Sequence, residues 1–155
     1  MSRTINQSVR VQASLDAIFK AFTEANEMER WWPSAVESDP KTGGSFKYSF
    51  ELLDPSVPVE ERAGKYTSVV PNQSISYPWN IPGLEPSTNV AIEFSAEGDR
   101  TVVSLEHSGW SSDKASDGVF SMHEQGWGGF LQNLKIVFEG GQDIRPTAMK
   151  MKTKA

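Results

Sequence analysis

Hydrophobic residues near the start of the chain alternate first with a period of two and then with the period of a helix. Ile5, Val9 and Val11 lie between polar residues, which predicts a strand. Ser14 follows and can cap a helix whose apolar residues recur at i, i+3, i+4 and i+7. Those residues are Leu15, Ile18, Phe19 and Phe22.

A second short helix is expected directly afterwards. Thr23 can cap it, Met28, Trp31 and Trp32 are its apolar residues, and Pro33 ends it. The chain therefore begins with a strand followed by two short helices.

Residues 43 to 107 return to alternation, which predicts a series of connected strands. Gly43-Gly44, Pro71-Asn72 and Gly98-Asp99 have the composition of turns, and residues 63–70 are expected to form a further strand. The alternating positions are Phe46, Tyr48, Phe50 and Leu52, then Ile75, Tyr77 and Trp79, then Val90, Ile92 and Phe94, and last Val103, Leu105 and His107. Strands connected in this way make an antiparallel sheet, and its apolar face must be covered.

One long helix at residues 116–139 is predicted to provide that cover. Its apolar residues form a single stripe that also contains His123, and Gly140-Gly141 ends the helix. The stripe consists of Phe120, Trp127, Phe130, Leu131, Leu134 and Phe138. Gly126, Gly128 and Gly129 each cost the helix roughly 0.5–1 kcal/mol relative to alanine. They allow a bend, the close approach of another backbone or a ligand, or simply room for the neighbouring rings.

This order of elements predicts an α+β fold with one domain at residues 1–141. Residues 142–155 show no apolar periodicity and contain Pro146. They carry four basic residues against one acidic residue, in a chain whose net charge is −5. We therefore expect residues 142–155 to be a flexible basic tail.

The composition excludes several classes of protein. A length of 155 residues suits one domain with a substantial core, and the negative net charge argues against a nucleic-acid partner. Without cysteine there is no disulfide framework, thiol catalysis or cysteine-built metal centre. The first residues are too polar for a signal peptide, and no apolar run reaches membrane-spanning length. We expect a cytoplasmic protein with no membrane span.

Short motifs in a fixed order give the sequence a resemblance to a known family. They are Ala13-Ser14 before Ile18-Phe19-Lys20-Ala21-Phe22-Thr23, Trp31-Trp32, Thr42-Gly43-Gly44-Ser45-Phe46, Gly64-Lys65-Tyr66, Tyr77-Pro78-Trp79, Thr101-Val102-Val103-Ser104-Leu105-Glu106-His107, and His123-Glu124-Gln125-Gly126-Trp127 with Leu131 and Leu134. The set, which runs from the first strand to Glu139, resembles the START-related, birch-pollen-allergen-like (SRPBCC) superfamily. It is most similar to the branch named for the activator of the heat-shock-protein ATPase. The insert at Asp54–Glu61 and the glycines beside Trp127 depart from the family pattern.

The resemblance implies a helix-grip fold, in which a curved antiparallel sheet wraps around the long C-terminal helix and leaves a cavity between them. In the superfamily such a cavity commonly takes apolar or amphipathic small molecules. The branch name adds a chaperone as a possible partner, although most of its bacterial-type single domains have no assigned ligand. A fold by itself does not define an activity.

Bulky rings with a polar atom are the main candidates for the lining of that cavity. Aromatic side chains supply apolar area, and tryptophan and tyrosine add one polar group for a ligand. The candidates are Trp32, Tyr48, Tyr77, Trp79, Phe94, Trp110, Phe120 and Trp127. The alternative is that these rings are ordinary core packing.

His107 and His123, the only histidines, complete the set of candidate ligand-binding residues. Each lies on an apolar face and can titrate near neutral pH, which would suit acid–base chemistry. The alternative is two hydrogen-bonded structural histidines, because Glu93 and Glu106 alternate outward and no partner carboxylate shares their faces. Two imidazoles without a third ligand do not make a metal site. We expect no catalytic residues, metal or cofactor.

Three classes of function remain open. The preferred hypothesis is a domain that binds an apolar or aromatic small molecule under the long helix. An enzyme of the polyketide-cyclase kind would need polar groups that converge on one reacting atom. A co-chaperone would need an exposed apolar or charged patch.

Overall fold

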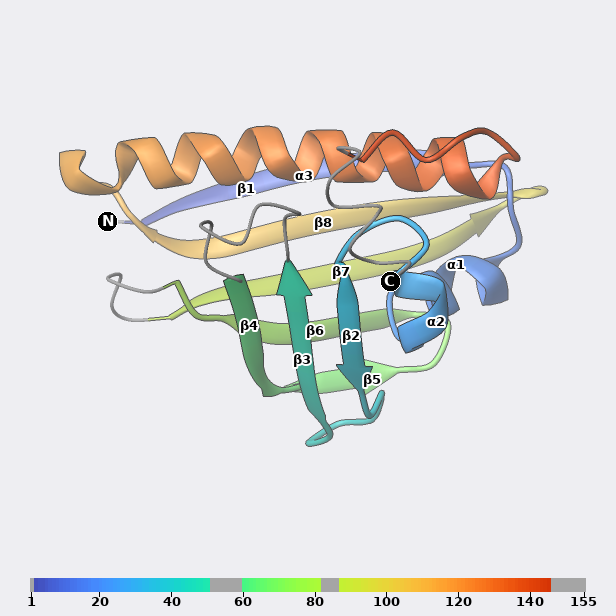
Figure 1. Cartoon of the computed structure of the whole chain (residues 1–155), viewed down its shortest axis with the longest axis horizontal. Coiled ribbons are helices and arrows are strands. Elements are labelled where there is room, and N and C mark those ends of the chain that lie inside the picture. Colours follow the sequence, from blue (N-terminus) through green and yellow to red (C-terminus); the bar gives the residue numbers. More distant parts are fainter. Residues whose placement is uncertain (1, 51–59, 82–86, 146–155) are drawn as a thin grey trace.

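Strands of the computed structural model, which describes residues 2–50, 60–81 and 87–145, form two antiparallel sheets (Figure 1). The larger sheet has five strands in the order β1-β8-β7-β6-β5. These are β1 (Ser2–Val11), β5 (Ser68–Val70), β6 (Ser74–Trp79), β7 (Thr88–Glu97) and β8 (Arg100–Ser111). The smaller sheet has the order β2-β3-β4, with β2 (Ala35–Ser38), β3 (Ser45–Phe50) and β4 (Glu60–Lys65). Strand β4 contacts β6, and β2–β4 run across the direction of the larger sheet in Figure 1.

Helices occupy the two places that the periodicity predicts. Helices α1 (Leu15–Ala21) and α2 (Ala25–Met28) follow β1, and a 3₁₀ turn at Lys114–Ser116 leads into α3 (Asp117–Phe138). The Ser14 hydroxyl caps α1 by accepting a hydrogen bond from the Ala17 amide. Helix α3 packs along β1 at one side of the larger sheet (Figure 1). The α+β helix-grip prediction, with a curved antiparallel sheet, is therefore confirmed.

The cap predicted for the second helix is wrong. Glu24 stands at the cap position of α2, and Trp31 and Trp32 lie beyond the end of the helix. The Thr23 hydroxyl instead donates a hydrogen bond to the Phe19 carbonyl oxygen inside the molecule. Thr23 therefore closes the first helix and does not open the second.

The strand predicted at residues 63–70 is two strands in different sheets. Tyr66 exchanges backbone hydrogen bonds with Gly43 and Gly44 beside β3, whereas the Thr67 amide donates to the Ser76 carbonyl oxygen in β6. The chain passes from one sheet to the other between these two residues. Strand β2, which the sequence pattern did not predict, pairs with β3. Leu52 and most of the Asp54–Glu61 insert lie outside the described residues.

A β-bulge in β8 decides which side chains enter the core. Opposite it, the register of β1 shifts between Arg3, which pairs with Trp110, and Ile5, which pairs with His107. Gly109 has φ +87°, a backbone conformation that residues other than glycine rarely adopt. As a result, His107 and Trp110 are both buried, although strict alternation would turn one of them outward.

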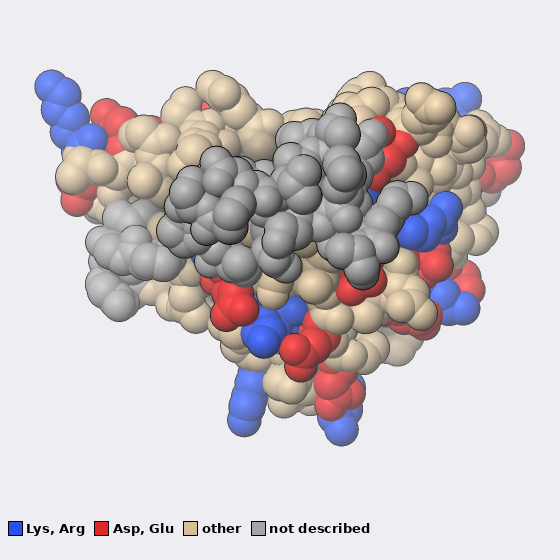
Figure 2. All heavy atoms as spheres, in the orientation of Figure 1, with Lys and Arg blue, Asp and Glu red and all other residues tan. Residues whose placement is uncertain are grey.

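The surface carries charges of both signs, and the described helices do not suggest a membrane span. On the face drawn in Figure 2, basic and acidic side chains of the described residues lie interspersed. Among residues 2–50, 60–81 and 87–145, no helix is both long and apolar enough to cross a membrane.

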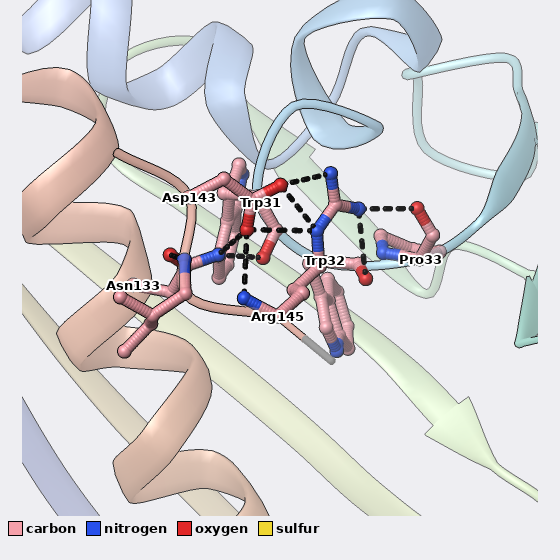
Figure 3. A network of polar contacts seen from close by, with 7 residues as sticks. Trp31, Trp32, Pro33, Asn133, Asp143 and Arg145 are labelled. Atoms are coloured by element: carbon pink, nitrogen blue, oxygen red, sulfur yellow. Dashed lines mark hydrogen bonds and ion pairs between the residues drawn. The ribbon is translucent and has the colours of Figure 1, made fainter. Parts of the chain in front are cut away.

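The segment after α3 differs from the mobile tail expected from residue 142 onward. It turns back along the end of α3 (Figure 1), and the Arg145 side chain points into the molecule (Figure 3), where the residue is only 5% exposed. The guanidinium pairs with the Asp143 carboxylate at 2.7 Å and donates hydrogen bonds to the carbonyl oxygens of Trp32 and Pro33. Residues 146–155 lie outside the described part of the chain.

Asn133 of α3 joins this segment to the loop that carries the two tryptophans. Its side-chain amide donates to the Trp31 carbonyl oxygen at 2.8 Å and to the Asp143 carboxylate, and accepts from the Ile144 amide (Figure 3). Burial works to raise the pKa of Asp143, but hydrogen bonds from Arg145 and Asn133 outweigh it, so the pKa is lowered. The three polar side chains thus hold the Trp31–Pro33 loop against α3.

Ending the chain after Gly141 is expected to lower the melting temperature by several degrees. The deletion removes Arg145 and Asp143 and leaves the buried Asn133 amide and the Trp32 carbonyl without these partners, at a cost of about 2–4 kcal/mol. Differential scanning calorimetry measures the loss. A chain ended after Arg145 keeps all of these contacts and is the matched control. Equal melting temperatures for the two truncated chains would show that the contacts do not stabilise the domain.

Candidate functional site

A hollow of about 190 Å³ opens between α3, β3, β4 and β6. Helix α3 supplies one wall, because His123, Gly126, Trp127 and Phe130 recur at helical spacing and so share one face. Phe50 of β3, Arg62 of β4, Trp79 of β6 and Trp32 of the loop after α2 supply the rest, with Met122 and Glu60 beside them. The hollow therefore lies where the resemblance predicts a cavity, between sheet and C-terminal helix.

Three indoles contribute to its apolar wall together with Phe50 and Phe130. The rings of Trp32 and Trp79 stack with centroids 5.8 Å apart and planes at 9°. The centroid of the Trp127 ring lies 5.0 Å from the ring centroid of Trp32 and 5.7 Å from that of Trp79. All three residues are buried, so each indole packs in the core and also borders the hollow.

Gly128 and Gly126 of α3 have different surroundings. A Cβ at Gly128 would lie 3.3 Å from the side-chain oxygen of Gln7, whose amide donates to the Glu124 carbonyl oxygen and joins β1 to α3. Gly126 faces the hollow, and a Cβ there would meet nothing within 4 Å. Gly128 therefore makes room for a neighbouring strand, whereas Gly126 leaves open space in the hollow.

His107 is the centre of a one-way chain of hydrogen bonds behind this wall. The Trp127 indole N–H can only donate, so Nδ1 of His107 accepts its hydrogen bond, at 2.9 Å. Nε2 of His107 then carries the proton and donates to the Thr88 hydroxyl at 2.7 Å, and that hydroxyl donates to the Trp79 carbonyl oxygen. The chain ties α3 to β8, β7 and β6 and fixes a neutral tautomer of His107.

Burial removes His107 from acid–base chemistry at neutral pH. It is the main cause that lowers the pKa of His107 to about 3, from an ordinary 6.5, with smaller contributions from His123 and Arg62. Both ring nitrogens are already hydrogen-bonded inside the core. The geometry therefore favours the alternative that His107 is a hydrogen-bonded structural histidine.

His123 lies at the hollow itself. A carbonyl oxygen can only accept, so Nδ1 carries the proton that it donates to the Val119 carbonyl oxygen at 2.9 Å. Nε2 is then left as an acceptor. Burial lowers the pKa of His123, the hydrogen bond to Val119 opposes the shift, and Arg62 adds to it. This histidine is the more accessible of the two.

Arg62 is the cationic residue of the lining. Its side chain is 6% exposed, and its Cζ lies 5.5 Å from the centroid of the Trp79 ring. Burial lowers the pKa of Arg62, and Glu60 opposes the shift. The side chain remains a cation, since arginine keeps its charge in proteins.

Only four of the ten candidate residues line the hollow, namely Trp32, Trp79, His123 and Trp127. Tyr48 and Tyr77 are buried more deeply, where burial raises the pKa of both hydroxyls and Tyr48 bonds to Tyr66 at 2.8 Å. The core-packing alternative therefore describes these two tyrosines.

The other candidate rings also pack away from the hollow. The Phe94 ring contacts Phe19 and Phe22, each with centroids 5.3 Å apart. Trp110 and Phe120 meet edge to face at 5.5 Å near the start of α3. Trp110 also packs against His107 and His123, with ring centroids 4.8 and 5.0 Å apart.

Sequence reasoning missed six residues at the hollow. Phe50 and Phe130 were already on predicted apolar faces, and Gly126 was singled out as a position that allows a ligand to approach. Arg62 and Glu60 had no signal, because they precede the strand expected at 63–70, and Met122 is an exposed helix residue. Within the described residues, no group of three or more His, Cys, Asp or Glu side chains is placed to hold a metal ion.

Comparison with known proteins identifies the family of this chain. Residues 12–139 match the family model described as Activator of Hsp90 ATPase homolog 1-like protein. The chain belongs to this family. A comparison with curated proteins finds no match.

Solved structures agree on the fold. The chain resembles an Aha1 dimer from Colwellia psychrerythraea with 22% identity and a TM-score of 0.72, covering 90% of this chain and 98% of that one. CalU16 from Micromonospora echinospora is similar at 23% identity and a TM-score of 0.73, over 99% and 83% of the two chains. An HSP90 activator from Plasmodium falciparum matches at 22% identity and a TM-score of 0.68, over 88% and 96%. At these identities the likeness concerns the fold.

Proposed function

We propose that this protein binds a small ring-bearing apolar molecule in the hollow between α3 and the strands β3, β4 and β6. The observation that carries the proposal is the wall of three indoles beside open space at Gly126. Ligand pockets are concave and mostly apolar, with a few polar groups that orient the ligand. Trp32, Trp79 and Trp127 supply the apolar part, and Arg62 and His123 supply polar groups.

The volume of the hollow indicates how large a group it can enclose. A buried apolar cavity of about 150 Å³ holds benzene, and sites for drug-sized ligands measure about 300–1,000 Å³. A hollow of about 190 Å³ therefore suits a molecule with one ring or a short branched chain.

Binding of such a molecule is expected to raise the melting temperature. At a hundred times its dissociation constant, a ligand stabilises the folded state by about 2.7 kcal/mol, which is roughly 5–10 °C for a domain of this size. A thermal-shift screen of neutral single-ring compounds measures the effect.

A pair of matched variants locates the binding. Gly126→Leu places a side chain in the hollow without backbone conflict and should abolish the shift. Gly118→Leu makes the same change in α3 at a position that also has open space but does not line the hollow, and it should keep the shift. Equal shifts in both variants, or no compound that binds, would count against the proposal.

A chaperone partner is the second candidate function. The family match supports it, as does the name of the similar HSP90 activator. Large exposed hydrophobic residues in the described part of the chain are Val70, Met122 and Ile144, which is a small apolar surface for a partner. The test is whether the protein changes the ATPase rate of an Hsp90-type chaperone. The cytoplasmic location suggested by the sequence stays a prediction.

A further inference from the structure

The buried guanidinium at the hollow has few acceptors. Arginine carries five N–H donors, and burial away from water requires partners for them. Nη1 of Arg62 donates to the Glu61 carbonyl oxygen at 3.0 Å, whereas Nη2 lies 3.5 Å from a carboxylate oxygen of Glu60. The Nε atom is buried and has no hydrogen-bond partner in the described part of the chain.

Glu60 is a weak partner for this cation. Its side chain is 68% exposed, and at 3.5 Å the contact is at the limit of a hydrogen bond. Exposed carboxylates gain little from an ion pair, because water solvates them almost as well. A carboxylate delivered by a ligand can therefore take the place of Glu60 at the guanidinium.

A second donor at the hollow also has no acceptor. Trp79 is 4% exposed, lines the hollow, and its Nε1 atom has no hydrogen-bond partner among the described residues. The Arg62 guanidinium lies 5.5 Å from the centroid of the same indole ring. Two neighbouring side chains that line the hollow, one from β4 and one from β6, thus carry buried N–H groups without partners in the part of the chain that the structure describes, and one of them carries a positive charge.

These observations select the chemistry of the ligand. The planar fork of arginine matches the two oxygens of a carboxylate, and one buried cation balances one negative charge. Stacked indoles suit a flat ring, and the volume admits about one. We propose that the hollow recognises an aromatic monocarboxylate of about one ring, whose carboxylate pairs with Arg62 while its ring packs against the indoles of Trp32, Trp79 and Trp127. This inference rests on the function proposed above and adds the charge of the ligand.

Benzoate and benzamide test the inference, because they share ring and shape and differ in charge. Isothermal titration should give benzoate at least about tenfold higher affinity than benzamide, as charge-assisted hydrogen bonds to a buried cation are strong. Arg62→Met keeps an unbranched apolar side chain but removes the guanidinium and its charge, so it should bring the ratio near one, with benzamide affinity little changed. Glu60→Gln removes the competing carboxylate and should raise the affinity for benzoate only.

The outcomes separate this inference from the proposed function. If neutral rings bind in the screen but benzoate and benzamide bind equally, the hollow binds rings and the carboxylate preference is wrong. If nothing binds to the unchanged protein, the proposed function itself fails. An Arg62→Met protein that keeps the preference for benzoate overturns the assignment to Arg62. If that variant does not fold, Glu60→Gln decides, and an unchanged ratio of benzoate to benzamide affinity overturns the inference.

Discussion

Replacing Trp127 with alanine is expected to lower the free energy of unfolding by about 3–5 kcal/mol, the usual cost of removing a large buried aromatic side chain. Trp127 is buried, its ring contacts those of Trp32 and Trp79, and its N–H donates to His107. The substitution removes all three interactions and leaves a void under the middle of α3. Urea unfolding followed by circular dichroism measures the loss.

Trp127→Phe separates the ring from its hydrogen bond. Phenylalanine keeps an apolar ring but leaves Nδ1 of His107 buried without a donor, so we expect a smaller cost of about 1–3 kcal/mol. A loss below about 1 kcal/mol for Trp127→Ala would mean that the residue borders the hollow without packing in the core.

Acidification is expected to destabilise the protein through His107. Above pH 6.5 the residue is neutral in both the folded and the unfolded chain. Below that pH the unfolded chain binds a proton that the folded chain does not accept until its pKa of about 3. The unfolded state then binds more protons, so stability falls as the pH falls. From about pH 7.5 to about pH 4.5 the expected loss from this residue is about 2–3 kcal/mol.

Two variants, compared for their loss of stability between these pH values, isolate the contribution of His107. His107→Gln should lose less stability over that pH interval than the unchanged protein, whereas His123→Gln keeps the buried His107 and should retain most of the pH dependence. NMR titration of the His107 ring checks the same point without mutation. A ring that takes up a proton near pH 6.5 in the folded protein would contradict the hydrogen-bond chain from Trp127 to Thr88.

The long helix and the run of strands could be predicted because their signals are local. Apolar residues at helical spacing define one face of α3 regardless of what covers it, and alternation does the same for β6, β7 and most of β8. The prediction failed where a distant partner decides the structure. Between Tyr66 and Thr67 the strand divides because the two residues bond to different sheets. The packing of Arg145 depends likewise on Trp32 and Pro33, more than a hundred residues earlier.

In the candidate site, too, the residues with a local sequence signal could be predicted and those placed by distant partners could not. Aromatic residues on apolar faces could be identified from the sequence, but periodicity does not distinguish a ring in the core from a ring at a hollow. Trp79 and Tyr77 belong to the same face of β6, yet only Trp79 reaches the hollow. Arg62 could not be found at all, because a charged residue next to an insert has the pattern of a solvated position.

The sequence by itself determined the α+β class, the order of the elements and the apolar faces, because these depend on residue spacing within single helices and strands. Only the tertiary structure decided that His107 is a neutral link between Trp127 and Thr88, and that Arg62 lies buried beside Trp79. Burial and hydrogen-bond partners belong to the packed assembly of several elements, and they set the charge and the chemistry of each side chain.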